Sequence, residues 1–228
     1  MTRTRYWHPD TEHIANLCRL VETEHPGLCI DIGASAFKFP MAHETLGWEG
    51  DRKVDFCRDR LPYDDGEVAF AFCRHTCEDL SDPTWLLSEI RRVARAGYIE
   101  TPSPVVELCR GVDADGAHLG YIHHRWVCCS RPSGHCVQTE ETSENRIFTA
   151  VAKYPCVEAC GINDMWHLLD GRPDRWNTRH LWTGPLNFRV LECSRGFHLG
   201  MKNPVTGYPD EYLKVLGECV KDFLSEHP

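Results

Sequence analysis

Short apolar segments and amphipathic segments alternate along the first half of the chain. The apolar runs at 28–35, 44–49, 53–57, 68–73 and 97–104 end at Gly, Pro or acidic residues, which is typical of buried strands. A short helix is predicted within residues 1–26, and a second over 81–97, where a capping residue, an early proline and a final glycine bracket an apolar stripe. This alternation predicts an α/β fold with a Rossmann-like, doubly wound, mostly parallel sheet.

The pattern is weaker in the second half. Residues 109–146 are rich in Gly, His, Cys and Ser, and 146–155 fits either a helix or a strand. Residues 179–192 predict two strands around Gly184, which would form an antiparallel C-terminal hairpin closing the sheet. The apolar spacing in 208–227 predicts a final helix.

The length divides these elements into a core and an addition. At roughly 150 residues per domain, 228 residues correspond to about one and a half domains. We therefore predict a core made of 1–104 and 179–228, with 105–178 as a Cys/His-rich insertion or cap.

Composition narrows the classes of protein. The chain has 34 acidic and 25 basic residues, a net charge of −9, which argues against nucleic acid as its partner. No apolar run is long enough to span a bilayer, and the first residues lack the apolar segment of a signal peptide. We expect a cytoplasmic protein that does not bind membranes, in which most of the 13 cysteines are buried free thiols.

Three segments resemble the class I S-adenosylmethionine-dependent methyltransferases, of the type 11-like group. They are DIGAS at 31–35, VDFCRDRLPYDDGEVAFAFCRHTCEDLSDP at 54–83, and the predicted helix running into YIETPSP. The resemblance covers 28–104 well and 120–192 weakly. It implies methyl transfer from S-adenosylmethionine to an oxygen or nitrogen of a small-molecule or glycan acceptor.

The resemblance also implies a site at the ends of the strands, where open parallel sheets bind ligands. Asp31 and the backbone after it would face the amino acid part of the cofactor, Glu49 the ribose hydroxyls, and Asp59 the adenine amino group. The implied cofactor-binding residues are Asp31, Gly33, Ala34, Glu49, Asp59, Arg60 and Arg74.

The acceptor side is implied by residues further along the chain. His75 is the candidate catalytic base, because a histidine titrates near neutral pH, although methyl transfer can also proceed by positioning alone. The candidate substrate-binding residues are Glu100, Thr101, His123, His124, Arg125 and Trp126. The histidines and Trp126 fit equally well with a role in packing the cap against the sheet.

Two departures from the family pattern keep other functions open. Gly33 is followed by Ala34 and further non-glycine residues, and Asp59 lies only ten residues after Glu49. A non-catalytic methyltransferase-like binding module is therefore an alternative. A zinc or thiol protein is a weaker one, since Cys128, Cys129, His135 and Cys136, or Cys156, Cys160 and His167, lack the spacing of a structural zinc site, and no metal ligand is assigned.

Overall fold

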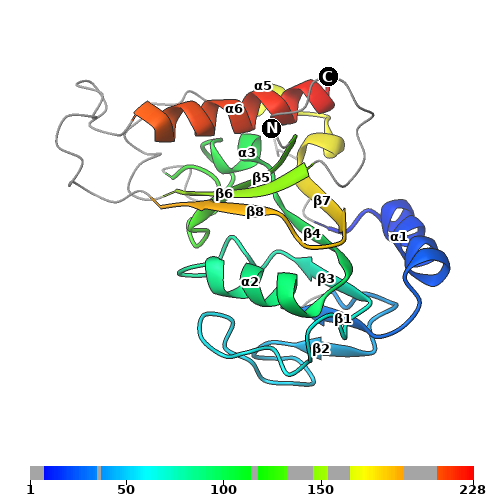
Figure 1. Cartoon of the computed structure of the whole chain (residues 1–228). Helices are drawn as coiled ribbons and strands as arrows, with labels where there is room; N and C mark the ends of the chain where they lie inside the picture. The colour runs from blue at the N-terminus through cyan, green and yellow to red at the C-terminus, as the bar shows by residue number, and fades with distance from the viewer. Residues whose placement is uncertain (1–7, 35–36, 114–117, 133–145, 154–164, 193–209) are drawn as a thin grey trace.

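A computed structural model describes residues 8–34, 37–113, 118–132, 146–153, 165–192 and 210–228, with side chains from 214 onward in the last segment. The fold is α/β, as predicted, and contains two sheets (Figure 1). The first has five strands in the order β2-β1-β3-β4-β7. Their bounds are β1 (Cys29–Ile32), β2 (Glu44–Leu46), β3 (Phe70–Arg74), β4 (Ala96–Pro102) and β7 (Asn177–Thr183).

The first sheet is mostly parallel. β2, β1, β3 and β4 run in the same direction, and β7 closes the edge antiparallel to β4. The chain moves outward from β1 to β2 and then returns to the other side of β1 for β3. The carboxyl ends of β1 and β3 therefore flank the point where the order of the strands reverses, which is where open α/β sheets bind ligands.

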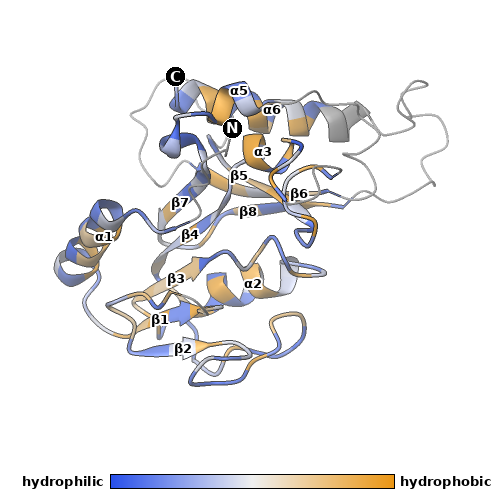
Figure 2. Ribbon diagram, turned by 180° about the vertical axis from the view of Figure 1, so that it is seen from behind, coloured by the Kyte–Doolittle hydropathy of each residue, from blue (hydrophilic) through white to orange (hydrophobic). Residues whose placement is uncertain are grey.

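The helices cover both faces of this sheet. On one face, α1 (Thr11–Glu24) begins at Asp10, whose carboxylate accepts hydrogen bonds from two backbone amides of the first turn, and packs Leu17 and Val21 beside Phe70 and Phe72. On the other face, α2 (Thr84–Val93) packs its apolar residues against β1, β3 and β4. Figure 2 shows the hydrophobic residues of β3 and α2.

Residues 53–57 do not form the predicted strand. Arg52 makes a single bridge to Leu46, after which backbone amides of Arg58 and Asp59 donate to the carbonyl oxygen of Asp55 and turn the chain. Val54 and Phe56 are buried, so the apolar pattern reports core packing without strand pairing. Asp59 consequently does not lie at the end of a strand.

The predicted C-terminal hairpin is also wrong, although both of its strands exist. β7 pairs with β4, whereas β8 (Phe188–Leu191) pairs in parallel with β6 in the other sheet. The ring of Trp182 on β7 occupies the space where Gly97 of β4 lacks a side chain, and Leu186 is buried between the two sheets. These contacts hold β7 and β8 in different sheets.

The second sheet contains β5 (Trp126–Pro132), β6 (Arg146–Ala152) and β8, with β5 and β6 antiparallel. The segment 146–155 thus contains a strand. Alternate residues of this sheet face α2 and the first sheet, and the others face α6 (Asp210–Glu226), the predicted final helix. Short helices α3 (Pro104–Glu107), α5 (Trp166–Leu169) and η2 (Pro173–Arg175) complete this side (Figure 1).

The cysteines of the described residues are all free thiols. Cys128 and Cys129 are buried on opposite faces of β5, so their side chains diverge and do not bind one ion together. His135, Cys136, Cys156 and Cys160 lie outside the described residues, and His167 is exposed on α5. None of the described helices is long and apolar enough to cross a bilayer.

Candidate functional site

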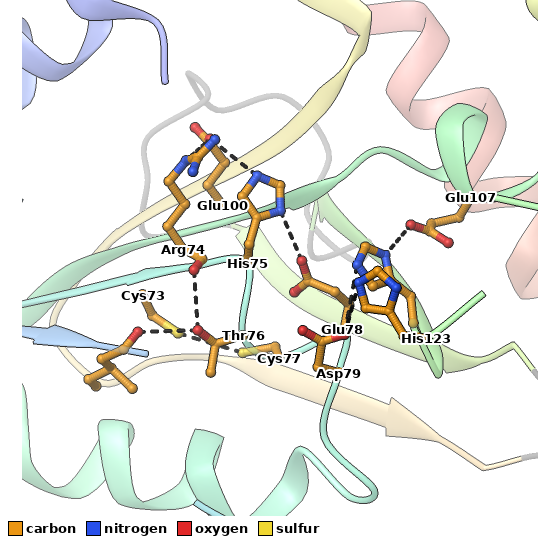
Figure 3. A network of polar contacts seen from close by, with 12 residues as sticks. Cys73, Arg74, His75, Thr76, Cys77, Glu78, Asp79, Glu100, Glu107 and His123 are labelled. Atoms are coloured by element: carbon orange, nitrogen blue, oxygen red, sulfur yellow. Dashed lines mark hydrogen bonds and ion pairs between the residues drawn. The ribbon is translucent and has the colours of Figure 1, made fainter. Parts of the chain in front are cut away.

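His75 lies directly after β3, at the reversal of the strand order, and has a left-handed backbone with φ of 49°. This conformation is unfavourable for a non-glycine residue and often occurs at functional sites. The backbone amide of His75 donates to the carbonyl oxygen of Glu100, which fixes the turn to β4. This turn directs the imidazole of His75 over the ends of the strands (Figure 3).

Glu78 holds the imidazole of His75. Nδ1 of His75 lies 3.0 Å from Oε1 of Glu78, whose side chain is only 1% exposed. Nε2 of His75 and Oε2 of Glu78 are buried and have no hydrogen-bond partner within the described part of the chain, and Nε2 lies 3.9 Å from Oε1 of Glu100. If Nδ1 carries the proton and donates to the carboxylate, Nε2 has a lone pair that can accept a proton.

A second buried pair adjoins His75. Nε of Arg74 donates to Oε1 of Glu100 over 2.7 Å, and the hydroxyl of Tyr98 donates to Oε2 over 2.5 Å. Arg179 of β7 approaches the same carboxylate at 3.7 Å. Burial, followed by the charge of Glu100, raises the pKa of Tyr98, so the phenol stays protonated. Thr101, which follows Glu100 on β4, is also buried.

Asp31 lies at the end of β1 with its carboxylate already engaged. Oδ2 accepts a hydrogen bond of 2.7 Å from the backbone amide of Phe39, whose ring stacks on Phe72 at 4.4 Å between centroids. Burial raises the pKa of Asp31 to about 6, although the amide of Phe39 and the charges of Lys38 and Arg74 act in the opposite direction. The segment after β1 thus packs on the sheet in place of a helix.

A contact within the protein explains why position 33 is a glycine. It has φ of 81°, and a Cβ there would lie 2.0 Å from Oγ1 of Thr76. That hydroxyl donates to the carbonyl oxygen of Ile32. Ala34 follows and is half-buried. The loop after β3 therefore closes on the turn after β1.

Three predicted cofactor residues lie on other loops. Glu49 is exposed in the turn after β2, and Asp59 and Arg60 are exposed beyond the turn at Asp55. The carboxylate of Asp59 accepts from the backbone amide of Asp55, and Arg60 lies 3.7 Å from Asp65. These contacts do not join the three residues to Arg74, His75 and Glu100.

A second polar cluster lies beside the first and was not predicted as a unit. Oδ1 of Asp79 lies 3.8 Å from Nε2 of His123 and 3.7 Å from Nε2 of His124. Burial raises the pKa of Asp79, as does the charge of Glu78, while both histidines act in the opposite direction. Figure 3 shows Asp79 and His123 close to the His75 and Glu78 pair.

Glu107 orients His124 from behind. Oε1 of Glu107 lies 2.6 Å from Nδ1 of His124, and Nζ of Lys153 donates to Oε2 over 2.6 Å. Burial would raise the pKa of Glu107, but the hydrogen bond from His124 and the charge of Lys153 outweigh it and lower the pKa. Burial alone would lower the pKa of His124, yet Glu107 raises it. The three residues form a buried ionic unit, in which the side chain of His124 retains 6% exposure.

An open hollow of about 490 Å³ adjoins this cluster. Its lining residues are Ser81, Ile122, His123, Arg125, Trp126, Ala152 and Glu192. Trp126 is buried and its Nε1 donates to the carbonyl oxygen of Leu80, so it packs the second sheet against the loop after β3. Arg125 is exposed at the rim.

Glu78, Asp79, Glu107 and Lys153 were not among the sequence-predicted site residues. The His-x-x-Glu spacing of His75 and Glu78 was visible in the sequence, but Glu107 and Lys153 are 46 residues apart and have no local signal. No protein-family model, curated protein or solved structure matches this chain.

Proposed function

We propose that the chain is an S-adenosylmethionine-dependent methyltransferase that modifies an oxygen or nitrogen of a small molecule or glycan. The observation that carries the proposal is His75, held in a left-handed conformation at the reversal of the strand order with Nε2 lacking a hydrogen-bond partner among the described residues. The order β2-β1-β3-β4 supports a Rossmann-like core, and the sequence resemblance supplies the reaction.

Charge at the strand ends fits the cofactor. Its amino acid part carries one positive and one negative group, and Arg74, Glu100 and Asp31 carry charges of both signs, so the cofactor would replace contacts that these side chains make within the protein. Bound S-adenosylmethionine would supply a methyl group on a sulfonium, and the carbon–sulfur bond would break as an oxygen or nitrogen nucleophile bonds to the methyl carbon, releasing S-adenosylhomocysteine. His75 would accept the proton of the nucleophile at Nε2, and Glu78 would stabilise the resulting imidazolium.

Calorimetric titration of the full chain with S-adenosylhomocysteine tests this function. We expect saturable binding of one ligand per chain, weakened by Arg74→Gln. His75→Asn tolerates the left-handed backbone and removes the imidazole, so it should leave ligand binding unchanged and lower the rate of methyl transfer. Absence of binding at millimolar ligand would overturn the proposal.

A non-catalytic methyltransferase-like module is the second candidate. Two observations favour it, namely the contact of Thr76 over Gly33 and the use of the Asp31 carboxylate by the amide of Phe39. Both occupy groups that the cofactor would otherwise meet. The same titration separates the two candidates, since this module would not bind S-adenosylhomocysteine.

A further inference from the structure

We propose that Asp79, His123 and His124 bind a divalent transition-metal ion of the zinc class. One ligand atom from each residue lies within 4.8 Å of the other two. Metal to nitrogen and metal to oxygen bonds of about 2.0–2.2 Å place neighbouring ligand atoms about 3.4 Å apart in a tetrahedral site. The distances of 3.7 and 3.8 Å from Asp79 therefore need only a small contraction.

The second shell of such a site is already built. In metal centres the ring nitrogen of histidine that does not bind the ion usually donates to a carboxylate, which fixes the tautomer and the direction of the ring. Glu107 lies 2.6 Å from Nδ1 of His124 and is itself held by Lys153. This arrangement leaves Nε2 of His124 directed toward Asp79 and available for an ion.

Backbone hydrogen bonds hold the two ligand segments together. The amide of Arg125 donates to the carbonyl oxygen of Glu78 over 2.6 Å, and the amide of Lys153 donates to the carbonyl oxygen of Arg125 over 2.7 Å. His123 and His124 therefore lie against Asp79 because of the fold, with no need for attraction between their side chains.

The site is accessible and acidic. His123 is 61% exposed and Asp79 is 43% exposed, so an ion can enter without disturbing the core. Glu78, Asp79 and Glu107 contribute three carboxylates to this cluster, against the ammonium of Lys153. Three protein ligands leave at least one coordination position open, and His123 also lines the neighbouring hollow. An oxygen ligand could reach the ion from there.

Titration of the chelator-stripped full chain with Co²⁺ and Zn²⁺ tests this site. We expect one ion per chain, with a cobalt spectrum of nitrogen and oxygen ligands. His123→Ala and Asp79→Asn change exposed side chains, and each should weaken binding by about tenfold or more. His167→Ala, at an exposed histidine on α5, is the matched control and should bind like the parent.

Three results would overturn the site: no stoichiometric ion in the stripped parent chain, unchanged affinity in His123→Ala, or intense thiolate charge-transfer bands at one equivalent of cobalt. Circular dichroism of each variant separates loss of a ligand from loss of the fold. Binding of S-adenosylhomocysteine is measured separately on stripped protein, so failure of the metal site and failure of the methyltransferase proposal are distinguishable.

Discussion

Glu107 and Glu78 are both buried carboxylates beside Nδ1 of a histidine, and they differ at the second oxygen. Oε2 of Glu107 meets Lys153 at 2.6 Å, whereas Oε2 of Glu78 has no hydrogen-bond partner in the described segments. The first carboxylate is fully compensated and serves to fix His124. The second retains hydrogen-bonding capacity, which is unusual for a buried group and is expected where a ligand completes the site.

The largest effect on stability should come from removing Lys153, the positive charge that compensates Glu107. Lys153→Met keeps the length of a fully buried side chain and leaves Glu107 with His124 as its charged partner, so we expect a loss of about 3–5 kcal/mol of unfolding free energy. Urea denaturation measures it. Adding Glu107→Leu should restore most of the loss, and a single-variant cost below about 1 kcal/mol would contradict this account.

The buried carboxylate of Asp31 lies between the cases of Glu107 and Glu78, because its partner is an uncharged group, the backbone amide of Phe39. Its pKa of about 6 lies above that of an unfolded aspartate, so the folded state binds the proton more tightly. Stability should therefore fall by about 3 kcal/mol between about pH 4 and about pH 6. Asp31→Asn keeps an acceptor for Phe39 and should remove this slope in unfolding experiments across that range. Parallel pH profiles of parent and variant would exclude a raised pKa.

Variants of His75 separate the cost of its left-handed backbone from the effect of losing the hydrogen bond of its imidazole. A left-handed residue with a Cβ costs about 1 kcal/mol relative to glycine, so His75→Gly should be more stable than His75→Ala by about that amount. Both variants lack the imidazole, and each therefore controls for the other. Equal midpoints in thermal denaturation would show that the turn relaxes.

The smallest change is expected at Glu78. Glu78→Gln weakens the contact with His75 but also removes a buried charge with an unpaired oxygen, and we expect less than about 1 kcal/mol of net change in stability. Glu107→Gln is the matched variant and should cost distinctly more. Similar costs at the two positions would remove the distinction between the pairs.

Local pattern predicted most of the elements. α1, α2 and α6 and the strands of the first sheet follow from apolar spacing and capping residues, which act within a few residues of each other. The predicted strand over 53–57 was wrong because the spacing of the buried residues Val54 and Phe56 is also that of a strand. The turn that replaces it depends on backbone hydrogen bonds to Asp55. The partner of β8 is set by packing between sheets and has no signal within 179–192.

The candidate sites divide in the same way. Arg74, His75 and Glu100 were predictable because each lies at or near the end of a recognisable strand, and the parallel sheet brings those ends together. Glu107 and Lys153 come from a four-residue helix and the residue after β6. Their pairing depends on the fold of the second sheet, which composition and periodicity do not encode locally.

The junction at Arg125 has a consequence for how this protein tolerates sequence change. The amide and the carbonyl of this residue connect the loop after β3 to the end of β6, and both groups belong to the main chain. Every amino acid except proline can supply them. The side chains around the two histidine sites can therefore diverge among variants while their relative placement persists, and Arg125→Pro is the substitution that would separate them.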